Sequence, residues 1–75
     1  MLKEDIKKLR KSLKLSRHKF GILISNQLGL EKGIYGYTIY RWETGRAKPN
    51  QVHEKTLNEL ANAREKYINS KKEQI

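Results

Sequence analysis

The sequence contains no cysteine, so the chain can form neither a disulfide nor a zinc site with thiolate ligands. No apolar run approaches the ~18–20 residues of a membrane span, and the first residues lack the apolar segment of a signal peptide. A chain of 75 residues is too short for a second lobe that would enclose a substrate cleft. We therefore expect one small cytoplasmic domain over residues 1–69, with residues 70–75 as a frayed tail.

Groups that carry out chemistry are also missing. His18 and His53 stand isolated among polar residues, where surface positions are favoured over metal ligands. No nucleophile, base and orienting group occur together, and the glycines at 29, 33 and 36 do not follow a strand as in a phosphate-binding loop. The sequence therefore predicts a non-enzymatic protein without a metal or cofactor.

Acidic residues are scarce relative to basic ones. The chain has 17 Lys and Arg against 8 Asp and Glu, which gives a formal net charge of +9. An excess of this size favours a polyanionic partner such as nucleic acid.

Apolar residues recur at helical spacing, which predicts an all-α domain of about four helices. Leu2, Ile6, Leu9 and Leu13 follow steps of four, three and four. This basic amphipathic segment fits the first helix of a bundle, with a helix on a membrane surface as the alternative. A second helix is expected over 17–28, with an apolar face of Phe20, Leu23, Ile24, Gln27 and Leu28. A short third helix is expected over 37–45, with Ile39 and Trp42 facing inward. A long last helix is expected from 51, with an apolar face of Val52, Leu57, Leu60, Ala61, Ala63, Tyr67 and Ile68.

Polar and glycine residues mark the expected helix ends. Ser16 and Asn50 are suitable N-caps, because each side chain can accept a hydrogen bond from a free amide of the following turn. Gly29 and Gly45 are suitable for the left-handed conformation that ends a helix. Thr38 is an alternative cap that would shorten the third helix.

The third segment ends in Tyr40-Arg41-Trp42-Glu43-Thr44-Gly45-Arg46-Ala47-Lys48-Pro49. With Ile39, Leu9-Arg10 and Leu15-Ser16, this motif resembles the phage Cro and repressor (XRE) family of helix-turn-helix proteins over residues 6–60. The resemblance implies a DNA-binding regulator, most simply a repressor, that inserts its third helix into the major groove of double-stranded DNA. It also implies a homodimer.

The spacing departs from the family pattern. Ser16 and Glu43 are 27 positions apart, which exceeds the family's usual spacing by about eight residues, or roughly two helical turns. We expect a second helix longer by about one turn and about four extra residues in a loop over residues 31–36. The role of this loop is open.

The resemblance implies that Arg10 pairs with Glu43 and links the first helix to the end of the third. A guanidinium fork matches a carboxylate, so the pair is physically reasonable. The alternative is that both side chains are solvated and contribute little.

Base-reading residues must point away from Ile39 and Trp42, which leaves Gly36, Tyr37, Tyr40 and Arg41. Arg41 can donate two hydrogen bonds to guanine. Tyr37 and Tyr40 can contact a thymine methyl or a phosphate, or can instead pack under the loop. Trp42 is expected in the core rather than as a stacking platform.

Phosphate contacts are expected from basic and hydroxyl groups beside the reading helix. They are Arg17, Lys32, Thr44, Arg46 and Lys48. Each cation has the alternative role of a solubilising charge.

Three rival functions remain: an antitoxin or accessory regulator that also binds a protein, a basic protein-interaction module without a DNA role, and a binder of structured RNA. The expected dimer interface is the last helix, with Leu60, Ala63, Tyr67 and Ile68 on one side. Alternatively this stripe folds back onto the core of its own domain.

Overall fold

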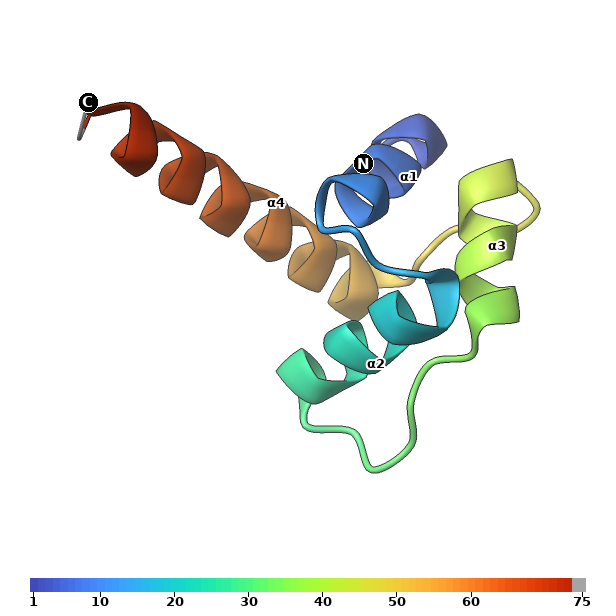
Figure 1. The fold of residues 1–75 in the computed structure, drawn as a ribbon. Coiled ribbons are helices and arrows are strands. Elements are labelled where there is room, and N and C mark those ends of the chain that lie inside the picture. Colours follow the sequence, from blue (N-terminus) through green and yellow to red (C-terminus); the bar gives the residue numbers. More distant parts are fainter. Residues whose placement is uncertain (74–75) are drawn as a thin grey trace.

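Residues 1–73 contain four helices joined by turns and loops, and this part of the chain contains no strand (Figure 1). The structure is a computed structural model that describes the backbone of residues 1–73 and the side chains of residues 1–67. The predicted all-α class is confirmed. The helices are α1 (Lys3–Ser12), α2 (Arg17–Leu28), α3 (Gly36–Thr44) and α4 (Gln51–Glu73).

The main helix contacts run from α1 through α3 and α2 to α4. α3 packs against both α1 and α2, and α2 packs against α4. Figure 1 shows that the later turns of α4 extend away from the other helices and that α3 lies at the edge of the molecule. One side of α3 is therefore free of other helices. No helix within residues 1–73 has the length and apolar character needed to cross a membrane.

The helix ends follow the predicted caps. Ser16 Oγ accepts a hydrogen bond from the amide of Lys19 at 3.2 Å, and Asn50 Oδ1 accepts one from the amide of His53 at 2.8 Å. Gly29 and Gly45 adopt the left-handed conformation with φ of 69° and 78°. These signals are local, because each depends on contacts within about one helical turn.

α3 begins before Thr38, the residue considered as an alternative N-cap. Its N-cap is Tyr35 and its first residue is Gly36, so Thr38 lies inside the helix and the alternative is wrong. The backbone N–H of Thr38 donates to the carbonyl of Tyr35 at 2.9 Å. Gly36 sits close against the start of α2, where a Cβ would lie 3.2 Å from the backbone nitrogen of His18.

The core is formed at the junction of all four helices. α2 differs from the predicted face, because Gly21 and Ser25 are buried while Gln27 is exposed and Leu23 is only half-buried. The buried face of α2 is rotated toward the loop that follows this helix. The buried hydrophobic residues are Ile6, Leu9, Phe20, Ile24, Ile39, Trp42 and Leu57.

The loop of residues 29–35 returns along α2 before α3 begins. The backbone N–H of Leu30 donates to the carbonyl of Ser25 at 3.0 Å, and Ile34 packs against the core. A Cβ on Gly21 would lie 2.0 Å from the carbonyl oxygen of Ile34. The loop therefore rests directly on the backbone of α2, at a position where only glycine fits. This loop of residues 29–35 begins two positions before the predicted loop of residues 31–36 and ends before Gly36.

Only the first part of α4 contributes to the core. Leu57 is fully buried, and Leu60 and Ala61 are partly buried against the core. Val52 and Ala63 were predicted on the apolar face of this helix, and that prediction is wrong. Val52 is 58% exposed, and Ala63 is also exposed. Val52 lies in the first turn, and Ala63 lies where α4 has left the other helices. The side chain of Ile68 lies outside the described residues.

α4 continues to Glu73, because no Gly or Pro between Gln51 and Glu73 interrupts helical hydrogen bonding. Residues 74 and 75 lie outside the described part of the chain.

Candidate nucleic-acid interface

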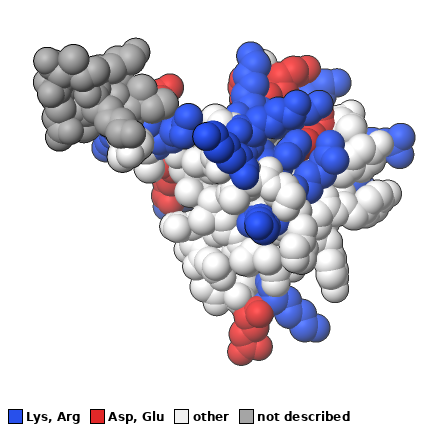
Figure 2. Space-filling view, viewed as in Figure 1, with Lys and Arg blue, Asp and Glu red and all other residues white. Residues whose placement is uncertain are grey.

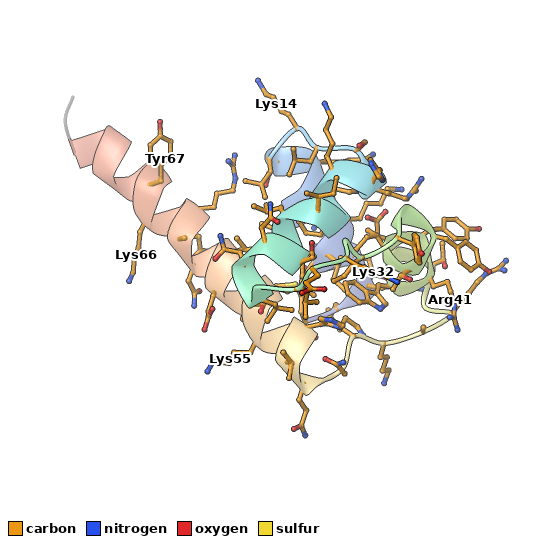
Figure 3. All side chains as sticks on the ribbon, turned by 90° about the horizontal axis from the view of Figure 1, so that it is seen from below. Lys14, Lys32, Arg41, Lys55, Lys66 and Tyr67 are labelled. Atoms are coloured by element: carbon orange, nitrogen blue, oxygen red, sulfur yellow. The ribbon has the colours of Figure 1, made fainter. Side chains whose placement is uncertain are left out.

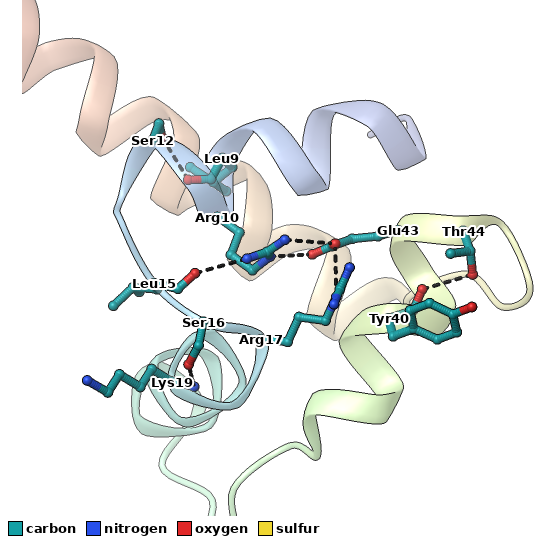
Figure 4. Close-up of polar contacts among 10 residues, drawn as sticks. All are labelled: Leu9, Arg10, Ser12, Leu15, Ser16, Arg17, Lys19, Tyr40, Glu43 and Thr44. Carbon is teal, nitrogen blue, oxygen red and sulfur yellow. Dashed lines mark hydrogen bonds and ion pairs between the residues drawn. The ribbon is translucent and has the colours of Figure 1, made fainter.

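Arg10 and Glu43 form the predicted ion pair, which joins α1 to the last turn of α3 (Figure 4). Arg10 Nε donates to Glu43 Oε2 at 2.6 Å, and Arg10 Nη2 donates to Oε1 at 3.2 Å. The Glu43 side chain is only 1% exposed, so the alternative of two solvated side chains is wrong. Arg10 Nη1 also donates to the carbonyl of Leu15 at 3.0 Å, which ties the α1–α2 turn to the same pair.

Arg17 forms a second ion pair with Glu43. Its Nε donates to Glu43 Oε1 at 3.3 Å, while 41% of its side chain remains exposed. The sequence predicted Arg17 as a phosphate contact at the start of the second helix and did not link it to Glu43. Its link to Glu43 depends on how α2 packs against α3, and no local pattern could have predicted it.

The outer face of α3 carries the residues expected to read bases. Ile39 and Trp42 are buried, as predicted, and Arg41 points away from the body of the molecule (Figure 3). Tyr37 is 66% exposed, so it does not pack under the loop. Tyr37 and Arg41 are therefore placed where a ligand on this side could reach them.

Tyr40 lies among other side chains and is only half-exposed. Its ring stacks against that of Tyr37, with centroids 6.2 Å apart. The guanidinium carbons of Arg17 and Arg46 lie 5.4 Å and 5.7 Å from the centroid of the Tyr40 ring. The fold thus gathers Arg17, Tyr40 and Arg46 from three segments of the chain.

The remaining predicted phosphate contacts are exposed, but they do not all lie together. Thr44 follows Tyr40 by one turn, and its hydroxyl donates to the Tyr40 carbonyl at 2.9 Å. Lys48 lies in the connector between α3 and α4. Lys32 lies in the loop that leads into the N-terminal end of α3, whereas Arg46 and Lys48 follow its C-terminal end in the chain.

Lys3 is a further cation beside α3 that the sequence pattern did not single out. A Cβ on Gly45 would lie 3.2 Å from Lys3 Cδ and 3.6 Å from Lys3 Nζ. An ammonium group at the C-terminal end of a helix interacts favourably with the helix dipole. Only the packing of α1 against α3 brings Lys3 to this position.

His53 is less exposed and less isolated than the sequence predicts. The His53 ring is half-buried and lies against the Trp42 ring, with centroids 5.3 Å apart. His18 is exposed, as expected. Among the described residues, no three His, Asp or Glu side chains gather as a metal site would require.

The positive charge is concentrated in the first three helices and their connections. Eleven Lys and Arg lie between Ile6 and His53, against only Glu31 and Glu43, so this stretch holds the whole net charge of +9. Glu43 is buried, which leaves Glu31 as the exposed carboxylate of this stretch. Figure 2 shows Lys and Arg gathered over α1, with a few acidic side chains among them and a mostly uncharged surface below.

Comparison with known proteins gave no match: no protein-family model, no curated protein and no solved structure corresponds to this chain. Function is therefore inferred from the geometry and charge described above.

Proposed function

We propose that this protein is a DNA-binding transcriptional regulator that inserts α3 into the major groove. The observation that carries the proposal is the uncovered face of α3, which presents Tyr37 and Arg41 while its single acid, Glu43, is buried and paired with two arginines. A face with an exposed arginine and no exposed carboxylate suits the negative surface of DNA. The motif that resembles the XRE family begins on the same helix and continues into the connector that follows it.

The dimensions of α3 suit this role. Its nine residues correspond to a helix about 14 Å long, and the major groove is about 12 Å wide. The helix lies at the edge of the molecule, so a duplex can approach it without displacing another helix (Figure 1).

Base recognition and phosphate binding are assigned to different residues. Arg41 projects outward and can donate two hydrogen bonds to O6 and N7 of guanine, while Tyr37 can contact a thymine methyl. Arg17, Arg46 and Lys48 lie beside α3 and would hold the phosphate backbone, with Thr44 and Lys32 as further contacts.

Regulation would follow from occupancy of the DNA. A protein bound over a promoter excludes polymerase, so repression is the simplest outcome. Because a single short helix makes few base contacts, we propose that two copies bind half-sites about 10 base pairs apart and associate through α4.

A titration of single variants on two duplexes tests the proposal. One duplex is enriched from a random library by selection on the unmodified chain, and the other is a scrambled sequence of the same composition. Arg41→Ala should remove about 1–3 kcal/mol of preference for the selected duplex and have little effect on the scrambled one. Lys48→Ala should weaken both duplexes equally and lower the log-log salt slope by about 0.9.

Lys66→Ala is the matched control, because Lys66 projects from the part of α4 that has left the other helices (Figure 3). Equal and weak binding of both duplexes by the unmodified chain would instead support a basic interaction module. If Arg41→Ala weakens both duplexes alike and Lys48→Ala changes the preference, the reading surface lies in the loop near Lys32 to Tyr37.

A further inference from the structure

Tyr40 lies at the meeting point of two arginines that come from separate segments of the chain. Arg17 opens α2, and Arg46 follows the end of α3. Both guanidinium carbons lie within 6 Å of the Tyr40 ring centroid, at 5.4 Å and 5.7 Å. This is the distance range in which a cation is attracted to the face of an aromatic ring.

Arg17 is also held from a second direction. Its Nε bonds to Glu43 Oε1, whose carboxylate is in turn fixed by Arg10. The bond to Glu43 uses Nε, so it leaves both terminal amino groups of the Arg17 fork for another acceptor. With 41% of the side chain exposed, that fork is oriented by the protein and accessible from solvent.

An arginine that is ordered before binding loses less side-chain entropy when it meets its ligand. A guanidinium fork matches the oxygens of a phosphate and can bond to two of them. Holding two such forks beside one ring brings like charges together, which is unfavourable for the free chain and favourable when a polyanion lies across them.

We infer that Tyr40 is a positioning residue, which orients Arg17 and Arg46 as a pair of phosphate contacts on one DNA strand, and that it does not read bases. The inference rests on the proposed function. It revises the expected role of Tyr40, whose half-buried ring is occupied by Tyr37 and the two arginines.

Binding titrations of Tyr40 variants test the inference. Tyr40→Phe keeps the ring and should bind the selected and scrambled duplexes within about twofold of the unmodified chain, whereas Tyr40→Leu should weaken both by about three- to tenfold. In a chain that already carries Arg17→Ala and Arg46→Ala, Tyr40→Leu should change binding by less than about twofold. Thermal melts establish that each variant is folded at the assay temperature.

Nuclear magnetic resonance of the free chain gives a readout without DNA. Tyr40→Leu should shift the side-chain resonances of both arginines as the ring current is lost, while Tyr40→Phe leaves them nearly unchanged. Tyr37→Leu is the matched control, because Tyr37 stacks on Tyr40, whereas Arg17 and Arg46 both lie over the Tyr40 ring.

The outcomes separate the two proposals. If Tyr40→Leu weakens binding to the selected duplex only, Tyr40 reads bases. If Tyr40→Leu weakens binding as much in the chain that carries Arg17→Ala and Arg46→Ala as in the unmodified chain, Tyr40 contacts DNA directly. Either result overturns the positioning role and leaves the proposed DNA binding intact. If the unmodified chain binds neither duplex, the proposed function and this inference both fail.

Discussion

Arg10 Nε lies 2.6 Å from Glu43 Oε2, and this contact joins residues 33 positions apart in the sequence. Both side chains are buried, so each charge depends on the other. Taking charges out of water is costly, and their mutual attraction offsets that cost only while both partners are present.

Glu43→Ala should therefore destabilise the protein by about 3–5 kcal/mol, because it leaves the Arg10 guanidinium buried without its carboxylate. Urea denaturation followed by circular dichroism measures the change. As a control, Arg10→Met combined with Glu43→Leu should lose far less than the sum of the single changes. An unchanged midpoint for Glu43→Ala would show that the pair does not stabilise the fold.

Gly21→Ala should destabilise the protein by about 1–3 kcal/mol, because the added methyl meets the Ile34 carbonyl oxygen and must displace the loop. Thermal unfolding measures this effect. Gly33→Ala in the same loop is the control, since its Cβ would only touch Ile22 Cγ1 at an ordinary 3.5 Å. Equal stabilities for the two variants would mean that the loop does not rest on α2.

Lys14→Gly should stabilise the protein by up to about 1 kcal/mol. Lys14 has a φ of 59° in the turn between α1 and α2. The left-handed conformation costs a non-glycine residue about 1–2 kcal/mol, and the extra freedom of glycine in the unfolded chain offsets part of the gain. A rise in the thermal midpoint is the expected result.

Lys8→Gly is the control for that prediction, because Lys8 lies inside α1 and glycine there should destabilise by about 1 kcal/mol. If Lys14→Gly lowers the midpoint by as much as Lys8→Gly, the turn does not hold the left-handed conformation.

Truncation after Asn62 should leave a folded domain that no longer pairs. Leu57, Leu60 and Ala61 remain, and these are the hydrophobic α4 residues that pack on or lie in the core. The removed part includes Tyr67, which is 59% exposed on the extended half of α4 (Figure 3). Sedimentation should give a monomer that binds DNA more weakly than the full chain, and a truncated chain that still sediments as a dimer would place the interface elsewhere.

The sequence by itself determined the parts of this protein that depend on neighbours within one or two helical turns. Ser16, Asn50, Gly29 and Gly45 mark helix ends, because a cap is a contact between residues a few positions apart. Hydrophobic spacing likewise predicted the inward position of Ile39 and Trp42. The Arg10–Glu43 pair came from the resemblance to a family, and the structure contains it.

Tertiary structure decided which distant groups meet. The loop covers Gly21, so the buried face of α2 rotates away from Gln27; the departure of α4 from the other helices leaves Ala63 exposed. Arg17 reaches Glu43 and Tyr40 only because α2 and α3 begin side by side. Such contacts depend on helix packing, and hydrophobic spacing along one helix specifies which face is apolar without specifying what will cover it.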